Sequence, residues 1–349
     1  MKYLAADVGG TFTDLVLVDS GTGRLLVDKV SSQATGSAGG VEDGIGRICQ
    51  AAGIAPGEID LFVHGFTVGT NAFLTRRGAK AALVVSEGMR DVLVIGDQMR
   101  PELYALTGTK PPPVIPRART IEAKERLDAF GAVVTALTEK EAARVADAVA
   151  ALAPESVAIS LGFSYLNADH ELALERAIRA KLPDVPIYLS TRVNPQIEEY
   201  PRGNTPAVAA YVGPIIGRYV DLLEKRLDGL GVAAPLRLMR SDGGIATPRA
   251  ARDNPAHMLL SGPAAGVVGV VPGDVLDVIR IETDVAKLPV GHRAVSQKMR
   301  RLVRHGARRG WRTALRIGDG RRSAVTWQLQ TRRLAARSLS IAATGPRIG

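Results

Sequence analysis

Apolar runs and polar breaks alternate along the first three quarters of the chain. Residues 3–6 and 15–18 are apolar and flank a polar stretch containing Gly9 and Gly10, which predicts two strands joined by a tight hairpin. Residues 25–30 extend this antiparallel meander as a third strand. Apolar residues then recur at helical spacing over residues 39–52, so we expect a helix there.

From residue 59 onward, predicted strands alternate with predicted helices along the chain. Thr138 and Glu141 occupy the two positions of a capping box, which marks the start of one of these helices. The alternation predicts an α/β fold with a largely parallel sheet covered on both faces. The expected strands cover residues 59–64, 81–85, 157–163, 187–190 and 236–240, and the expected helices cover residues 67–77, 88–95, 138–152, 167–181 and 205–230.

Two segments depart from this alternation. Residues 100–119 are rich in Pro and Gly, which predicts an irregular loop. Residues 261–269 consist almost entirely of small residues, which predicts an N-capped helix that can approach another element closely.

Length and composition narrow the class of protein. A chain of 349 residues can form two domains with a sizeable core. We expect no membrane span, because the sequence has no apolar run of about 18 residues, and no secretory leader is visible. The single cysteine, Cys49, excludes an intrachain disulfide and fits a reducing cytoplasm, where we expect the protein to be. Its helical context predicts that Cys49 is a small buried hydrophobe.

The polar stretch between the first two predicted strands carries the main candidate chemistry. Gly9 and Gly10 let the backbone approach a ligand closely, and successive N–H groups there can form an anion-binding concavity. Thr11 and Thr13 stand at alternate positions, so both hydroxyls are expected on one face. These donors suit a nucleotide phosphate.

Two carboxylates bracket the same stretch. Asp7 and Asp14 are the best candidates to hold a hydrated Mg²⁺ and to organise the phosphate. Their alternative role is to cap the turn through hydrogen bonds to its backbone.

Further candidate side chains follow the fourth predicted strand. His64 stands at its predicted end, where sites of α/β proteins commonly lie; it contacts substrate or is a structural, hydrogen-bonded histidine. Thr67 and Asn71 begin the next predicted helix and either present donors to an anion or cap the helix. The sequence has neither a zinc-like His/Cys spacing nor a G-x-S-x-G elbow.

These motifs, in this order, resemble the A subunit of the hydantoinase/5-oxoprolinase family (N-methylhydantoinase A-like) over about residues 1–275. The matching segments are residues 7–14 (DVGGTFTD), 64–72 (HGFTVGTNA), 88–93 (GMRDVL), 100–104 (RPELY), 210–214 (AYVGP) and 261–269 (SGPAAGVVG). A carbohydrate kinase of the same fold class would share the first motif but not the later ones.

The resemblance implies an actin/sugar-kinase/Hsp70-like (ribonuclease H-like) nucleotide-binding fold. It also implies ATP-dependent hydrolysis of a cyclic amide of the hydantoin or 5-oxoproline type, through phosphorylation of the carbonyl oxygen. ATP and Mg²⁺ are then the cofactors, a cyclic amide is the substrate, and a hydantoinase B-type subunit is the partner. We predict a site with Asp7, Asp14 and His64 as catalytic residues, Asp7 and Asp14 as metal ligands, and Gly9, Gly10, Thr11, Thr13, Thr67 and Asn71 as cofactor contacts.

One expected element of the family is absent from the sequence. A second phosphate loop of the form D-x-G-G-T-S is expected after the small-residue helix, but residues 275–284 contain no Gly-Gly-Thr. We therefore expect one lobe to be largely complete and the second truncated. The expected organisation is an N-terminal domain over residues 1–190, the beginning of a second domain over 191–275, and a basic tail over 276–349. The alternative function is a catalytically silent remnant or partner-binding module of that family.

The net charge of +10 comes from the C-terminal segment. Residues 281–349 hold 16 of the 45 Lys and Arg but only 3 of the 35 Asp and Glu, so the rest of the chain is mildly acidic. Three interpretations remain open: a nucleic-acid-binding tail that uses Trp311 and Trp327, a disordered extension, or out-of-frame translation of a once longer gene. We favour the last because the family resemblance stops where the composition changes, and we expect no nucleic-acid partner.

Overall fold

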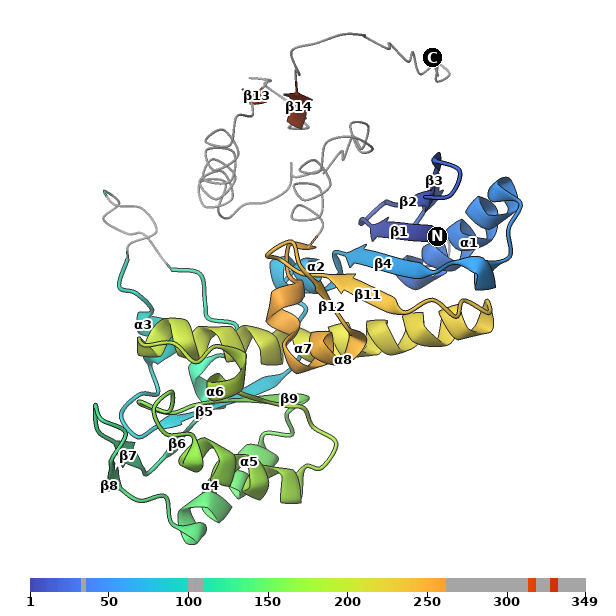
Figure 1. Ribbon diagram of the computed structural model, residues 1–349. Helices are drawn as coiled ribbons and strands as arrows, with labels where there is room; N and C mark the ends of the chain where they lie inside the picture. The colour runs from blue at the N-terminus through green and yellow to red at the C-terminus, as the bar shows by residue number, and fades with distance from the viewer. Residues whose placement is uncertain (33–35, 100–103, 105–109, 262–312, 318–326, 332–349) are drawn as a thin grey trace. The chain divides into compact units, whose positions relative to one another are not determined.

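The computed structural model describes residues 1–32, 36–99, 104, 110–261, 313–317 and 327–331 (Figure 1). The chain divides into two compact units, Met1–Gly273 and Asp274–Gly349. In the second unit, β13 (Thr313–Ile317) pairs antiparallel with β14 (Trp327–Thr331). The predictions for the small-residue helix after Ser261, and most of those for the basic segment, lie outside the described residues.

A six-stranded mixed sheet forms the N-terminal part of the first unit. Three of its strands form the predicted antiparallel meander. Two strands from later in the chain run parallel to the first strand of that meander. The order is β12-β11-β4-β1-β2-β3. The strands are β1 (Lys2–Val8), β2 (Phe12–Asp19), β3 (Arg24–Ser31), β4 (Leu61–Phe66), β11 (Leu236–Met239) and β12 (Ile245–Ala246).

Alternation along these strands decides which face of the sheet is buried. Leu4 of β1 and Leu15 of β2 are fully buried against α1 (Gly36–Ala52) and the C-terminal part of α7 (Glu199–Gly229). A Cβ on Gly44 of α1 would meet Leu15 Cδ1 at 2.3 Å, so this glycine permits the close contact between helix and sheet. Burial of one such leucine contributes about 2 kcal/mol. Cys49 is buried in this core, as predicted.

The second sheet is wholly parallel, in the order β10-β9-β5-β6. Helices α4 (Glu139–Ala151) and α5 (Asp169–Lys181) pack on one face, and α3 (Val92–Ile95), α6 (Ser190–Val193) and the N-terminal part of α7 pack on the other. This is the predicted parallel sheet with two covered faces (Figure 1). Its strands are β5 (Ala81–Ser86), β6 (Thr120–Ala123), β9 (Ser156–Ser160) and β10 (Ile187–Leu189).

The helix α7 joins the cores of the two sheets. It spans 31 residues and begins six residues earlier than predicted. Pro201 falls in its first turn, where the missing N–H has no intrahelical partner to lose, so this proline does not delay the helix start. A Cβ on Gly213 would lie 2.0 Å from Tyr188 Oη, so the glycine permits close packing on β10.

The remaining elements are short. Helix α2 (Val68–Leu74) ends three residues before its predicted end, and Arg76 takes a positive φ of 57° there. Among the helices of the described residues, none is both long and apolar enough to cross a bilayer. The other elements are η1 (Pro56–Glu58), η2 (Arg117–Arg119), β7 (Arg126–Leu127), β8 (Val133–Thr135), α8 (Pro248–Asp253) and η3 (Pro255–Met258).

Candidate functional site

The hairpin between β1 and β2 places two aspartates side by side. Asp7 pairs with Asp14 in the strand register, and the Gly9 N–H donates to the Phe12 carbonyl at 2.9 Å to close the bend. A Cβ on Gly10 would meet nothing within 4 Å, whereas one on Gly9 would lie 3.1 Å from that carbonyl. The bend is therefore open on the Gly10 side and permits close approach of a ligand to the backbone there.

Asp7 carries an unsatisfied buried oxygen. Within the described part of the chain, its Oδ1 is buried and has no hydrogen-bond partner. Burial, and secondarily the charge of Asp14, raise the pKa of Asp7. A buried carboxylate oxygen without a donor is costly, so the arrangement fits a cation or a bound water at this position.

Gly65 of β4 makes room for this carboxylate. It stands beside Asp7 in the parallel register, and a Cβ on Gly65 would lie 2.7 Å from Asp7 Oδ1. Gly65 could not be singled out from the sequence, because only the pairing of β1 with β4 brings it beside Asp7.

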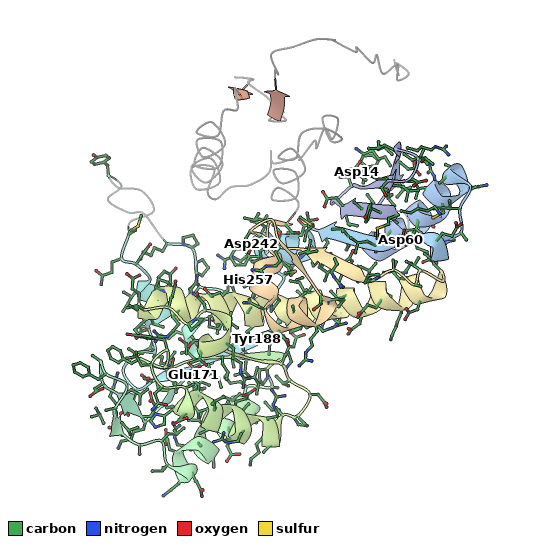
Figure 2. The ribbon with its side chains drawn as sticks, in the orientation of Figure 1. Asp14, Asp60, Glu171, Tyr188, Asp242 and His257 are labelled. Carbon is green, nitrogen blue, oxygen red and sulfur yellow. The ribbon has the colours of Figure 1, made fainter. Side chains whose placement is uncertain are left out.

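Asp14 (Figure 2) is exposed and forms an ion pair that we did not anticipate. Lys29 Nζ lies 3.2 Å from Asp14 Oδ1 and 5.2 Å from the centroid of the Phe12 ring. The two charged residues are register partners on β2 and β3. The predicted meander contained this signal, because extending its pairing from the turn places Lys29 opposite Asp14.

The two threonines of the hairpin lie in different surroundings. Thr13 is buried, and its Oγ1 lies 2.8 Å from Ser32 Oγ on the core side of the sheet, whereas Thr11 is exposed in the bend. Only the Thr11 hydroxyl is therefore exposed to a ligand, whereas we expected both hydroxyls to be available there.

His64 lies in the core, inside β4 and not at its end. Its Nδ1 lies 3.2 Å from the Ala6 carbonyl and its Nε2 lies 2.7 Å from Tyr219 Oη. Since a carbonyl only accepts, Nδ1 is the protonated nitrogen and Nε2 accepts from the tyrosine. Burial lowers the pKa of His64 to about 4, so the ring is neutral at pH 7. Strand alternation places this ring on the opposite face from Gly65, and therefore away from Asp7.

Thr67 connects the start of α2 to the hairpin. Its Oγ1 donates to the Val8 carbonyl at 3.1 Å, and it makes no side-chain capping bond to α2. Asn71 is exposed, and its Nδ2 lies 3.4 Å from Thr67 Oγ1. The structure therefore brings Thr67, and through it Asn71, to the residue that precedes the glycine bend.

The segment ending at Ser261 reaches the same edge of the sheet. Ser261 Oγ donates to the Phe66 carbonyl at 3.1 Å, and the Leu260 N–H donates to Thr70 Oγ1 at 3.0 Å. These two bonds attach the start of the small-residue motif to the end of β4 and to α2.

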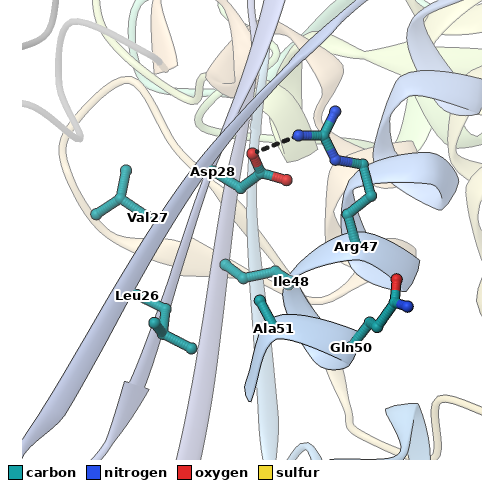
Figure 3. A pocket seen from close by; sticks show the side chains of 7 residues that line it. All are labelled: Leu26, Val27, Asp28, Arg47, Ile48, Gln50 and Ala51. Atoms are coloured by element: carbon teal, nitrogen blue, oxygen red, sulfur yellow. Dashed lines mark hydrogen bonds and ion pairs between the residues drawn. The ribbon is translucent and has the colours of Figure 1, made fainter. Parts of the chain in front are cut away.

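Two other features lie apart from the hairpin bend. Asp242 (Figure 2), after β11, accepts from the Gly244 N–H at 3.0 Å and from Arg240 at 2.7 Å, so its carboxylate stabilises a turn. A pocket between β3 and α1 contains the ion pair of Asp28 with Arg47 and offers an apolar floor (Figure 3). The residues that line it are Leu26, Val27, Asp28, Arg47, Ile48, Gln50 and Ala51.

The donor set at the hairpin fits magnesium better than a transition metal. Within the described residues, no group of three or more His, Cys, Asp and Glu side chains could hold a metal ion. Mg²⁺ commonly uses one or two carboxylates and completes its shell with water and phosphate oxygens, which the paired Asp7 and Asp14 permit.

Fold and hairpin together define an α/β protein with a two-glycine bend and paired carboxylates at the carboxyl end of a mixed sheet. The hydantoinase/oxoprolinase N-terminal region model matches residues 3–182, and the hydantoinase/oxoprolinase model matches residues 202–281. The chain therefore belongs to the hydantoinase/oxoprolinase family, as the motifs predicted.

Three relatives illustrate the similarity. Caprolactamase subunit alpha of Pseudomonas jessenii is 32% identical over 289 residues, and 5-oxoprolinase of Dictyostelium discoideum is 30% identical over 295 residues. The crystal structure of the ATP-dependent caprolactamase superimposes with a TM-score of 0.68 at 30% identity. The nucleotide-free structure of acetone carboxylase gives a TM-score of 0.70 at 26% identity.

The similarity covers most of this chain but a smaller part of each relative. It spans 80% of this chain and 41% of caprolactamase subunit alpha, and 75% of this chain and 23% of the 5-oxoprolinase. For the acetone carboxylase structure the shares are 77% and 40%.

Proposed function

We propose that the chain is the nucleotide-binding part of an ATP-dependent hydrolase that opens a cyclic amide of the hydantoin or 5-oxoproline type. The observation that carries this proposal is Asp7 Oδ1, a buried oxygen without a hydrogen-bond partner among the described residues, beside a two-glycine bend. Similarity to an ATP-dependent caprolactamase and to a 5-oxoprolinase supports the substrate class.

In this proposal the hairpin binds the phosphates and their metal. The Gly9 amide closes the bend, so the backbone of Gly10 and the hydroxyl of Thr11 are the donors toward phosphate. Asp7 and Asp14 hold Mg²⁺, directly or through its water ligands. When bound, Mg·ATP would supply the phosphoryl group that makes the ring carbonyl susceptible to water.

The remaining candidate residues would either neutralise phosphate charge or hold the hairpin in its conformation. Lys29, 3.2 Å from Asp14, would offset negative charge on the phosphates. Thr67 fixes the carbonyl before Gly9, and Asn71 extends the polar edge beside it. We assign Thr13 and His64 positioning roles, because their hydrogen bonds hold the core face of the same strands.

We further propose the actin/sugar-kinase/Hsp70-like fold for this unit, with a second lobe needed to complete the nucleotide cleft. The meander that continues into parallel strands supports this fold. The domain limits we propose are residues 1–190, 191–275 and 276–349. A hydantoinase B-type subunit is the proposed partner, since the relatives include a caprolactamase subunit alpha and an acetone carboxylase beta subunit.

Calorimetric titration of the full chain with a non-hydrolysable ATP analogue, with and without Mg²⁺, tests the proposal. We expect Mg²⁺-dependent binding that Asp7→Asn weakens at least tenfold. The matched control is Asp147→Asn, which alters an exposed carboxylate on α4 paired with Lys181 at 2.7 Å and should bind like the parent.

Two results would contradict the proposal. One is no binding by the folded chain even when a B-type subunit is present, which is the outcome expected of a catalytically silent remnant. The other is equal affinity of the parent and Asp7→Asn.

A further inference from the structure

Strand β3 is the outermost strand of the N-terminal sheet (Figure 1). It pairs with β2 on one side, and among the described residues no strand pairs with its other side. Its eight residues keep a continuous register with β2 and include no proline. Edge strands commonly carry a bulge, a proline, charged side chains or a cover that prevents pairing with another chain. β3 has neither a bulge nor a proline, but it carries the charged residues Arg24, Asp28 and Lys29, so only a partner with complementary charges suits this edge.

Two backbone bonds determine which groups of β3 point outward. The Gly9 N–H donates to the Phe12 carbonyl, and the Ser32 N–H donates to the Thr11 carbonyl, both at 2.9 Å. In an antiparallel ladder, bonded pairs recur every second residue. The even-numbered residues of β3 therefore bond to β2, and Leu25, Val27 and Lys29 direct their N–H and C=O groups away from the sheet.

Side-chain exposure agrees with an unpaired edge. Val27 is 65% exposed and Leu25 is 38% exposed, both on the face opposite α1. The Lys29 N–H takes a local acceptor, the Asp28 carboxylate at 2.8 Å. The free edge of β3 therefore presents two exposed apolar side chains beside a row of backbone N–H and C=O groups that point away from the sheet.

The charges along β3 select a partner strand. We propose that a second copy of this chain pairs its own β3 antiparallel to this one, with Leu26 opposite Leu26 of the second copy. In that register Arg24 lies opposite Asp28 of the other copy, and the same pair recurs through the two-fold symmetry. Leu25 lies opposite Val27, again twice.

Neighbouring registers lack this complementarity. The outward odd-numbered groups permit shifts of two residues only, because a shift of one would place outward groups opposite inward ones. A shift of two places Asp28 opposite Leu26 in one direction and opposite Thr22 in the other, so neither register pairs Asp28 with a cation. The favoured register also puts the charges at non-bonded positions, where opposing side chains are closest.

The pocket of Figure 3 receives the central residue of the second strand. Leu26 faces α1 and forms the pocket floor with Ile48 and Ala51. Leu26 of the second copy lies beside its counterpart and covers that floor. Asp28, already 3.1 Å from Arg47, then lies between two arginines of opposite copies.

This inference is independent of the proposed function, and the oligomeric state of the full chain tests it. We expect a dimer by sedimentation equilibrium and at least a tenfold weaker dimer for Val27→Lys. The matched control is Val134→Lys, because Val134 of β8 is an equally exposed strand valine at 64%. A monomeric parent, or a Val27→Lys variant as dimeric as the control, would overturn the inference.

Cysteine crosslinking tests the register separately. In a Cys49→Ala background, Leu26→Cys should form an intermolecular disulfide under mild oxidation, because each copy of residue 26 faces the other. Leu25→Cys should crosslink much less, since its opposite residue is Val27. Equal crosslinking of the two variants, or none at residue 26, would contradict the proposed register.

Discussion

The two sheets differ in whether their buried carboxylates have hydrogen-bond partners. In the second sheet, Glu171 accepts from the Leu161 N–H at 3.0 Å, from Ser190 Oγ at 2.6 Å and from the hydroxyl of Thr191 at 2.9 Å. In the N-terminal sheet, Asp7 Oδ1 is buried without a partner among the described residues. A satisfied carboxylate stabilises the fold, whereas an unsatisfied one marks a place where a ligand completes the structure.

A second buried carboxylate strengthens the comparison. Glu125 accepts a hydrogen bond from Ser86 and lies 2.7 Å from Nδ1 of His170. The Gly162 N–H donates to the same serine at 2.8 Å. This network ties the ends of β5 and β9 together, so these polar groups stabilise the second sheet.

Among single substitutions, removal of the satisfied carboxylate is expected to lower the stability of the fold most. Glu171→Ala should lower the free energy of unfolding by roughly 3 kcal/mol, because Ser190, Thr191 and the Leu161 amide lose their acceptor. Urea unfolding with an unchanged m-value measures this loss. Asp147→Ala, on the exposed face of α4, is the control and should change little; a loss below about 1 kcal/mol for Glu171→Ala would break the comparison.

Protonation of His64 in the N-terminal sheet is expected to make the free energy of unfolding depend on pH. The pKa of its imidazole falls from 6.5 in the unfolded chain to about 4 in the folded protein. Between pH 6.5 and 4 the imidazole is therefore protonated in the unfolded chain but neutral in the folded protein. Stability is therefore lost as the pH falls from 6.5 to 4, by about 3 kcal/mol in total. Unfolding midpoints measured across this range should show the loss for the parent, and a much flatter profile for His64→Phe.

The smallest expected change in stability is at Asp7. Because burial raises its pKa, the charged form is disfavoured in the fold, and the cost is fully present above the folded pKa. Asp7→Asn removes the charge and should raise the free energy of unfolding of the ligand-free protein at pH 7 slightly. Asp14→Asn, at an exposed position, is the control. Destabilisation by Asp7→Asn would mean that the carboxylate contributes to the fold itself.

Local sequence pattern predicted the elements well where short-range forces decide them. Gly9 and Gly10 between apolar runs predicted the hairpin, and Thr138 does accept a bond from the Glu141 N–H at 3.2 Å as an N-cap. The strand with His64 runs from Leu61 to Phe66, two residues beyond its expected end. The aromatic residues Phe62 and Phe66, two positions to either side, were the available signal that His64 faces the core.

The parts that depend on distant pairing were not predictable from one sequence. The open side of Asp7 exists because β1 pairs with β4 and places Gly65 beside it. The division into two sheets and the long reach of α7 depend on packing between segments far apart in the chain. Burial of Thr13 depends on the number of residues in the bend, because that number decides which residues of β2 face the core.

The titration of Asp7 itself, followed by ¹³C-carboxyl NMR, tests the central claim most directly. In the ligand-free protein we expect the pKa of Asp7 above the ordinary range of an aspartate, because the carboxylate is buried. Addition of Mg²⁺ with a non-hydrolysable ATP analogue should move that pKa downward, since a bound cation favours the charged form. A pKa of Asp7 that is ordinary from the start, or that does not move on addition of the ligand, would contradict the assignment of this hairpin as the metal and phosphate site.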